Sequence, residues 1–127
     1  MIRVLLVDDQ SLVRAGFRAL LDAEAGIEVI GEAADGEEAV RMASALTPDV
    51  ILMDLSLPII DGWEATRRLK AHQDLKAIPV IALTAHAMRG DEEKARASGC
   101  DDFLTKPIDE DLLLETLNRF LGTNATS

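Results

Sequence analysis

The chain has 127 residues and a single cysteine, and its 23 acidic against 13 basic side chains give a formal net charge of −10. This length suffices for one domain that buries about two thirds of the surface its unfolded chain exposes. The acidic balance argues against nucleic acid as a partner, because binding phosphates requires a basic patch. No apolar run reaches the ~18 residues of a membrane span and Cys100 alone builds no disulfide framework, so we expect a cytoplasmic protein without membrane contacts.

Strand and helix patterns alternate along the chain. The sequence predicts strands over residues 2–7, 28–34, 50–53, 80–83 and 102–104. It predicts helices over residues 11–24, 37–46, 61–71 and 89–98 and a last helix after residue 109, with Ser11, Asp61 and Asp109 as N-terminal caps. Such an alternation predicts a doubly wound α/β domain: a parallel five-stranded sheet between two layers of helices, with right-handed crossovers.

Three of these elements differ from the rest in composition. The strand over 28–34 is partly polar, which favours an edge of the sheet. The helix over 89–98 is highly charged and offers little but alanines to bury, so we expect it to pack loosely. The last helix carries more leucines than one core-facing stripe requires. The surplus belongs either to a broad core stripe or to a surface that binds a partner.

Polar side chains follow the strands where each one ends. Asp8 and Asp9 follow the first strand, Asp54 the third, Thr84 the fourth and Lys106 the fifth. In open parallel sheets, ligands bind beyond the carboxyl ends of the strands, where the strand order reverses. Taken singly, each residue is as well explained as a helix cap, a turn or a loop residue. Together they predict a site at this edge of the sheet.

The predicted site combines three carboxylates, a hydroxyl and an ammonium group. Carboxylates about 4 Å apart repel by on the order of 4 kcal/mol per pair at an effective dielectric near 20, which a divalent cation relieves. Hard oxygen ligands in small number suit Mg²⁺, with Mn²⁺ as a possible substitute. Such a site suits phosphoryl transfer: Asp54 attacks in line as nucleophile, while Thr84 and Lys106 bind the phosphoryl oxygens.

These residues lie in segments that resemble the receiver domain of two-component response regulators, the CheY-like family. The matching segments are Leu-Val-Asp-Asp at 6–9, Asp-Gly-Glu-Glu-Ala at 35–39, Pro-Asp-Val-Ile-Leu-Met-Asp-Leu-Ser-Leu-Pro at 48–58, Leu-Thr-Ala at 83–85 and Thr-Lys-Pro at 105–107. The resemblance implies a flavodoxin-like three-layer sandwich with strand order 2-1-3-4-5. It implies a receiver domain over residues 1–121, and we expect residues 122–127 to form a flexible tail.

The resemblance also assigns roles in the metal site. Asp54 is implied as the phosphoacceptor, which takes phosphate from the histidine of a sensor kinase or a histidine phosphotransfer protein. Asp9, Asp54 and the backbone carbonyl of Ser56 are implied as direct ligands of Mg²⁺, with Asp8 acting through a water molecule. The protein is thus expected to be a signalling phosphoacceptor rather than an enzyme, with self-phosphorylation from small donors and autodephosphorylation.

Further residues are implied to bind and sense the phosphoryl group. Thr84 and Lys106 hold its oxygens, and Phe103 stands at the switch position, where it differs from the tyrosine of many relatives. Ser56 and His86 occupy positions that vary in the family and tune the lifetime of the phosphoryl group. The switched surface is the fourth helix, fifth strand and fifth helix, which we expect to contact a downstream protein or a second copy of the chain.

The family docks its phosphodonor on the opposite flank. Here that flank corresponds to Val13 and Arg14 at the start of the first helix and to Pro107 and Ile108 after the fifth strand. We expect these residues to contact the kinase or phosphotransfer protein.

Other interpretations remain open at this point. Parts of the sequence resemble receivers within larger transcriptional regulators or hybrid kinases, of which this chain would be a fragment. A phosphatase of the haloacid dehalogenase type has a second acid two residues after its nucleophile, where this chain has Ser56. A flavodoxin needs a Ser/Thr/Gly-rich loop after the first strand, where this chain has Asp8 and Asp9. A binding module that never turns over phosphate is the last alternative.

Overall fold

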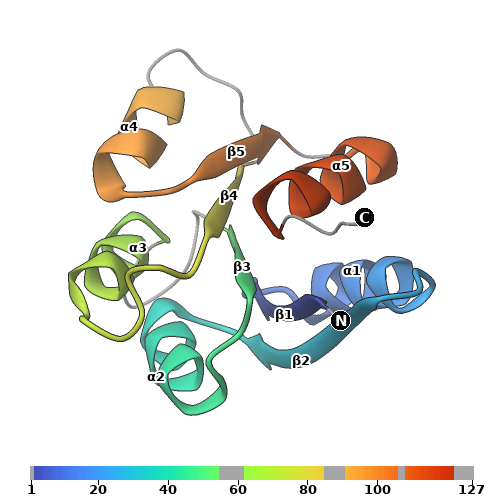
Figure 1. Ribbon diagram of the computed structural model, residues 1–127, viewed down its shortest axis with the longest axis horizontal. Helices are drawn as coiled ribbons and strands as arrows, with labels where there is room; N and C mark the ends of the chain where they lie inside the picture. The colour runs from blue at the N-terminus through green and yellow to red at the C-terminus, as the bar shows by residue number, and fades with distance from the viewer. Residues whose placement is uncertain (1, 55–61, 85–90, 106–107, 122–127) are drawn as a thin grey trace.

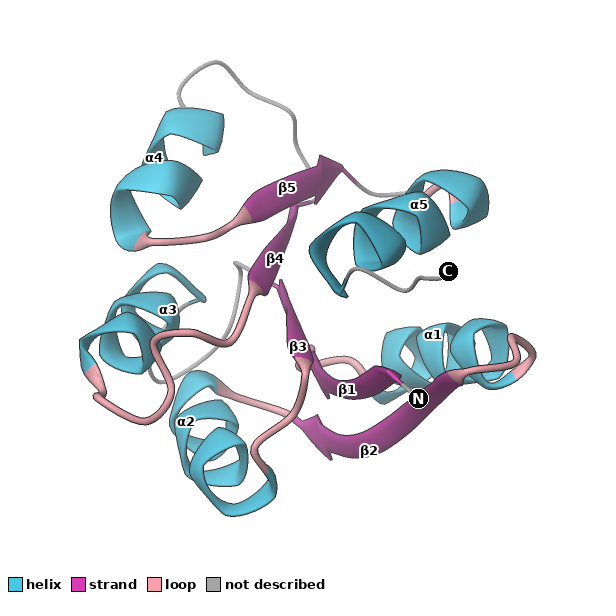
Figure 2. Ribbon diagram, in the orientation of Figure 1, coloured by secondary structure: helices cyan, strands magenta, loops and turns pink. Residues whose placement is uncertain are grey.

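The computed structural model describes residues 2–54, 62–84, 91–105 and 108–121. Five strands and five helices alternate along the chain (Figures 1 and 2): β1 Ile2–Val7, α1 Ser11–Asp22, β2 Ile27–Ala33, α2 Gly36–Leu46, β3 Val50–Asp54, α3 Gly62–Ala71, β4 Val80–Thr84, α4 Asp91–Ser98, β5 Asp102–Thr105 and α5 Glu110–Leu121. All strand pairs are parallel, in the order β2-β1-β3-β4-β5. The predicted fold and strand order are confirmed, and the partly polar β2 lies at an edge.

Helices cover both faces of the sheet, as Figure 1 shows, with α1 and α5 on one face and α2, α3 and α4 on the other. The side chains of β1 alternate between these faces: Val4 and Leu6 join one apolar cluster, and Leu5 and Val7 join another. The first cluster includes Leu21 of α1 and Leu113 and Leu117 of α5. The second includes Ala39 and Ala43 of α2 and Ala65 and Leu69 of α3.

Among the residues that the structure describes, β3 is the most deeply buried strand. Val50 to Met53 are 0 % exposed and Asp54 at the end of the strand is 5 % exposed. The strand lies between β1 and β4, with Met53 beside Val7 and Asp54 beside Leu83. A strand packed on both faces and paired on both edges holds its last residue rigidly in place.

The predicted N-terminal caps of the helices are confirmed only in part. Asp109 caps α5, since its Oδ1 accepts a hydrogen bond from the amide of Leu112 at 3.0 Å. The prediction of Ser11 as a cap was wrong. The helix α1 begins at Ser11 itself and follows Gln10, whose side chain makes no capping hydrogen bond among the described residues. The amide of Gln10 instead donates to Asp8 Oδ1 at 2.9 Å, and this turn brings the chain into the helix one residue early. Asp61 lies outside the described residues.

Within the described residues, no helix is long and apolar enough to cross a membrane. Cys100 is buried, as expected for a small core side chain, and its sulfur lies 3.7 Å from both Thr66 Oγ1 and Ser98 Oγ. Burial raises the pKa of the Cys100 thiol. The protonated thiol is a poor nucleophile, so Cys100 has a structural role.

Two glycines differ in how they should respond to an added methyl group. Gly99, after α4, has a φ of +103°, and a Cβ there would stand 2.7 Å from Lys70 Cγ. Gly99→Ala should therefore lower the free energy of unfolding by about 1–3 kcal/mol. Gly16 within α1 has no atom of the described residues within 4 Å of such a Cβ, so Gly16→Ala should raise the free energy of unfolding by about 0.5–1 kcal/mol. Urea unfolding of the two variants measures both changes, and equal shifts would contradict this account.

Candidate functional site

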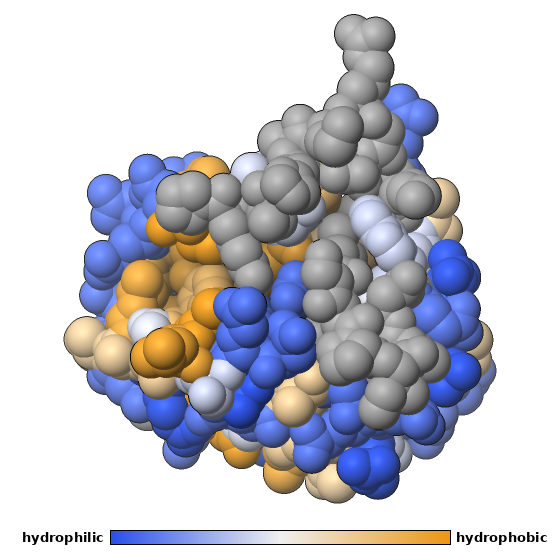
Figure 3. All heavy atoms as spheres, turned by 180° about the vertical axis from the view of Figure 1, so that it is seen from behind, coloured by the Kyte–Doolittle hydropathy of each residue, from blue (hydrophilic) through white to orange (hydrophobic). Residues whose placement is uncertain are grey.

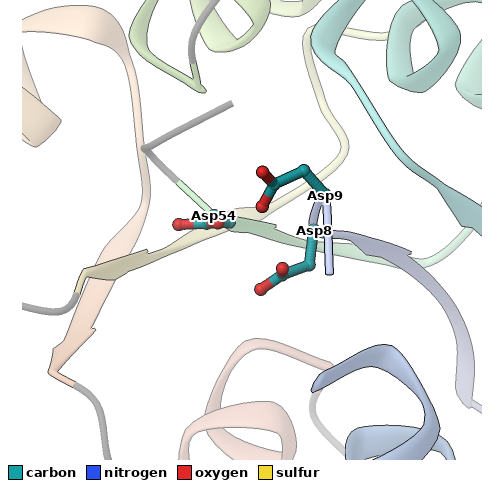
Figure 4. Close-up of side chains that lie close together, drawn as sticks. All are labelled: Asp8, Asp9 and Asp54. Atoms are coloured by element: carbon teal, nitrogen blue, oxygen red, sulfur yellow. The ribbon is translucent and has the colours of Figure 1, made fainter. Parts of the chain in front are cut away.

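Three carboxylates meet where two neighbouring strands end. Asp8 and Asp9 follow β1, and Asp54 ends β3, which pairs with β1 through Val7 and Met53. One oxygen from each of the three side chains lies within 4.8 Å of the others (Figure 4). Asp8 is 3 % and Asp54 5 % exposed, whereas Asp9 is open to solvent. The convergence of these three residues, predicted from the strand ends, is confirmed.

The charges of this cluster favour a cation. Like charges at such distances repel by up to about 4 kcal/mol per pair, less where water screens the exposed Asp9. The donor atoms are all carboxylate oxygens, which Mg²⁺ and Mn²⁺ prefer. Asp9 is exposed, so water can reach the cluster from its side. The cluster therefore fits a small divalent cation.

The backbone of Asp8 is held on both sides. Its amide donates to the carbonyl of Ala33 in β2 at 3.0 Å, and its carbonyl accepts from Arg14 Nη1 at 2.5 Å. Its carboxylate also accepts a hydrogen bond from the amide of Gln10, at Oδ1 and 2.9 Å. These bonds fix the chain where it leaves β1.

Thr84 and Phe103 lie on the strands that continue this edge of the sheet. Thr84 ends β4 one residue beyond Leu83, the neighbour of Asp54, and is 8 % exposed. Phe103 of β5 pairs with Ala82 and packs, partly buried, against the apolar cluster on the α2 and α3 side. The structure thus places Thr84 at the edge that carries Asp54. Ser56, His86, Lys106 and Pro107 lie outside the described residues.

The expected docking residues are less accessible than their neighbour Leu12. Val13 and Arg14 in α1 and Ile108 before α5 are half-buried, while Leu12 is 85 % exposed. On the face seen in Figure 3, apolar surface gathers on the side of the molecule that α1 and α5 occupy. The sequence analysis did not single out Leu12 as an exposed apolar residue. Its position off the core stripe of Val13 and Phe17 was a signal that it faces solvent.

A family comparison covers nearly the whole domain. Residues 4–118 match the model of the response regulator receiver domain. The chain belongs to this family. It is 44 % identical over 119 residues to the polar-differentiation response regulator DivK of Brucella ovis, covering 94 % of this chain and 95 % of DivK. A receiver domain of two-component systems has neither the second acid of a haloacid dehalogenase nor a flavodoxin's phosphate loop, so membership decides against both alternatives.

Solved receiver domains have the same fold. The receiver domain of the sensor histidine kinase PA1611 of Pseudomonas aeruginosa, with magnesium coordinated in its active-site cleft, is 38 % identical, covers 96 % of this chain and 98 % of its own, and has a TM-score of 0.87. The receiver domain of Ssk1 of Saccharomyces cerevisiae, crystallised with the histidine phosphotransfer protein Ypd1, is 29 % identical, covers 94 % of this chain and 88 % of its own, and has a TM-score of 0.84.

Proposed function

We propose that Asp54 is the phosphoacceptor of this receiver and takes its phosphoryl group from a histidine of a sensor kinase or histidine phosphotransfer protein. The observation that carries this proposal is the approach of Asp8, Asp9 and Asp54 to within 4.8 Å at the end of the most buried strand. Two buried carboxylates beside a third repel one another unless a cation or a proton neutralises them, which favours a functional role. The Ypd1–Ssk1 complex supports a phosphotransfer protein as one class of partner.

The reaction is a single displacement at phosphorus. Asp54 attacks the phosphorus and forms an acyl phosphate, while the P–N bond to the donor imidazole breaks and its electron pair stays on nitrogen. The protein positions the nucleophile, because β3 holds Asp54 in place at 5 % exposure. Thr84 at the end of β4 donates a hydrogen bond to a phosphoryl oxygen, and Lys106 supplies a positive charge.

The acidic cluster holds Mg²⁺ in this proposal. Asp9, Asp54 and the backbone carbonyl of Ser56 would hold the ion directly and Asp8 through water, as the family pattern implies. When bound, the ion neutralises charge on the oxygens of the transferring group. The magnesium described in the cleft of the PA1611 receiver supports this choice. Mn²⁺ has the same ligand preference and should substitute.

The acyl phosphate then changes the surface of the domain. Thr84 and Lys106 move toward the new oxygens, and Phe103, packed at the edge of a core cluster, turns inward into the space that Thr84 leaves. Shifting a two-state equilibrium from 1:99 to 99:1 requires about 5.5 kcal/mol, and hydrogen bonds to charged groups contribute about 1.5–3 kcal/mol each. His86 and Ser56 tune how long this state lasts.

The switched surface is formed by α4, β5 and α5. Arg119 of α5 forms an ion pair with Asp102 of β5, and this pair joins the helix to the strand. The guanidinium carbon of Arg119 also lies 5.4 Å from the centre of the Phe120 ring. Leu113 and Leu117 of α5 are buried, but Leu112 is 48 % exposed. This surface contacts a downstream protein or a second copy of the chain.

Phosphorylation by a small donor tests the proposal. The protein is incubated with acetyl phosphate and Mg²⁺, and its intact mass is measured. We expect the mass of one phosphoryl group to be gained with Mg²⁺ or Mn²⁺ and not after chelation with EDTA. An unchanged mass with acetyl phosphate and phosphoramidate alike would leave only a binding module.

Docking of the phosphodonor should depend on Leu12, together with Val13 and Ile108 and the adjoining Pro107. Leu12→Ser should slow transfer roughly tenfold, because an apolar anchor is lost from the interface. The donor is the phosphorylated kinase that transfers fastest to the wild type in a panel of purified kinases. Ala19→Ser, also exposed and two turns further along α1, is the control. Phosphorylation by acetyl phosphate should be unchanged in both; slowing there would assign Leu12 a role within the site.

A further inference from the structure

Arg14 makes its contacts inside this chain rather than toward solvent. Its side chain is 17 % exposed. The guanidinium donates through Nη1 to the backbone carbonyl of Asp8 at 2.5 Å and through Nε to Glu32 Oε1 at 3.0 Å. Arg18, one turn further along α1, donates to the other carboxylate oxygen of Glu32. Glu32 therefore accepts from two arginines of one helix and holds Arg14 in place.

These contacts link the backbone of Asp8 to β2. The backbone carbonyl of Ala33, which follows Glu32 in β2, accepts a hydrogen bond from the amide of Asp8 at 3.0 Å. β2 thus holds the backbone of Asp8 at two points. It binds the Asp8 amide directly, and it binds the Asp8 carbonyl indirectly, through Glu32 and Arg14. The Asp8 carbonyl belongs to the peptide group that leads into Asp9. Fixing this carbonyl sets the plane of that peptide group and so the direction in which Asp9 leaves it.

An irregularity in the sheet turns Glu32 toward α1. The pairing of β1 with β2 shifts by one residue after Val4, so that Leu6 pairs with Glu32 rather than with Gly31. Leu6 belongs to the cluster on the α1 and α5 side. A bulge of this kind redirects the side chains that follow it to the opposite face. Without it, Glu32 would lie on the face away from Val29 and could not reach Arg14.

We infer that Arg14 and Glu32 are positioning residues that hold the Asp8–Asp9 segment in the geometry in which its carboxylates face Asp54. This inference rests on the proposed metal site. Without a bound cation, repulsion acts to push the exposed Asp9 away from the other two carboxylates. A backbone fixed from β2 resists that displacement. The planar guanidinium suits the task because its Nε and Nη1 donate to two acceptors in a fixed geometry, which a lysine ammonium does not do.

The alternative is a plain ion pair between α1 and β2. Partly exposed ion pairs contribute about 0–1 kcal/mol to stability and would affect the cluster only through the fold as a whole. Arg18 provides the matched control, because it pairs with Glu32 and with Asp22 but, within the part of the chain that the structure describes, makes no hydrogen bond with Asp8. Arg14→Met removes the bond to the Asp8 carbonyl, whereas Arg18→Met leaves it in place.

Three measurements on the full chain separate the two roles. The first is the Kd for Mn²⁺, from the electron paramagnetic resonance signal of the free ion. The second is the hydrogen exchange of the Gln10 amide, which donates to Asp8 Oδ1, in the metal-free protein. The third is urea unfolding, which confirms that each variant is folded under the conditions used.

We expect Arg14→Met to raise the Kd for Mn²⁺ roughly tenfold, in the range for loss of a group that orients a metal ligand, and to speed the exchange of the Gln10 amide. Arg14→Lys should recover part of the affinity, and Glu32→Gln should resemble a weaker Arg14→Met. Arg18→Met should stay within about twofold of the wild type. Equal affinities and equal exchange in the Arg14→Met and Arg18→Met variants would overturn the inference.

Two further outcomes are distinguishable. If Arg14→Met slows only the transfer from a kinase and leaves Mn²⁺ affinity and Gln10 exchange unchanged, Arg14 is a docking residue and the inference fails. If the wild type takes up no Mn²⁺, or as much as Asp9→Asn does, the proposed metal site fails. Faster exchange of the Gln10 amide in Arg14→Met would then still support the fixed Asp8–Asp9 segment, and unchanged exchange would overturn it too.

Discussion

Asp54→Ala should gain no phosphoryl group from acetyl phosphate or from any phosphorylated kinase. The substitution removes the attacking oxygen, and the hydroxyl and lysine that bind the phosphoryl group cannot replace it. Asp54→Asn should behave in the same way, because an amide oxygen is a far weaker nucleophile than a carboxylate. Intact-mass measurement after incubation with Mg²⁺ and donor checks this. The expected loss is complete within the detection limit.

The control for this prediction is Asp74→Ala, which removes an exposed carboxylate in the segment after α3. It should be phosphorylated like the wild type. Urea unfolding checks that both Asp54 variants are folded under the conditions of the assay. A phosphoryl group gained by Asp54→Ala would identify another acceptor and refute the proposed chemistry.

Mg²⁺ should stabilise the wild type and fail to stabilise Asp9→Asn. An ion that binds only the folded state raises the free energy of unfolding by about 2.7 kcal/mol at a hundred times its Kd. In EDTA, Asp9→Asn should instead be more stable than the wild type by on the order of 1 kcal/mol, because one repelling charge is gone. The gain is small because water screens charges at this exposed position. Urea unfolding with and without Mg²⁺ measures both effects.

Glu37→Gln serves as the control, because it neutralises an exposed carboxylate in the first turn of α2. It should respond to Mg²⁺ as the wild type does. Equal stabilisation of Asp9→Asn and the wild type by Mg²⁺ would place the cation elsewhere on the protein.

The arrangement of the site followed from local signals. The apolar run from Val50 to Met53 identified a strand buried on both faces, and the alternation of strands and helices placed Asp8, Asp9 and Asp54 at one edge of a parallel sheet. These predictions required only that neighbouring strands run in the same direction. The structure confirms each of them.

The contacts of Arg14 could not be predicted in this way. Simple alternation along β2 places Val29 and Glu32 on opposite faces and so predicts that Glu32 faces away from α1. The one-residue shift in the pairing of β1 and β2 reverses this, and it depends on how the two strands fit together rather than on either sequence. The wrong cap at Ser11 has a similar origin, since the turn formed by Asp8 and Gln10 sets where α1 begins.

The sheet also acts as a partition. The apolar clusters on its two faces share no residue among those described, because alternate side chains of each central strand enter one cluster or the other. Substitutions in groups that do not touch contribute additively to stability. The sequences of α1 and α5 can therefore change to recognise new donors while α2 and α3 keep their packing. Evolution can thus alter the signalling partner without changing the fold of the domain.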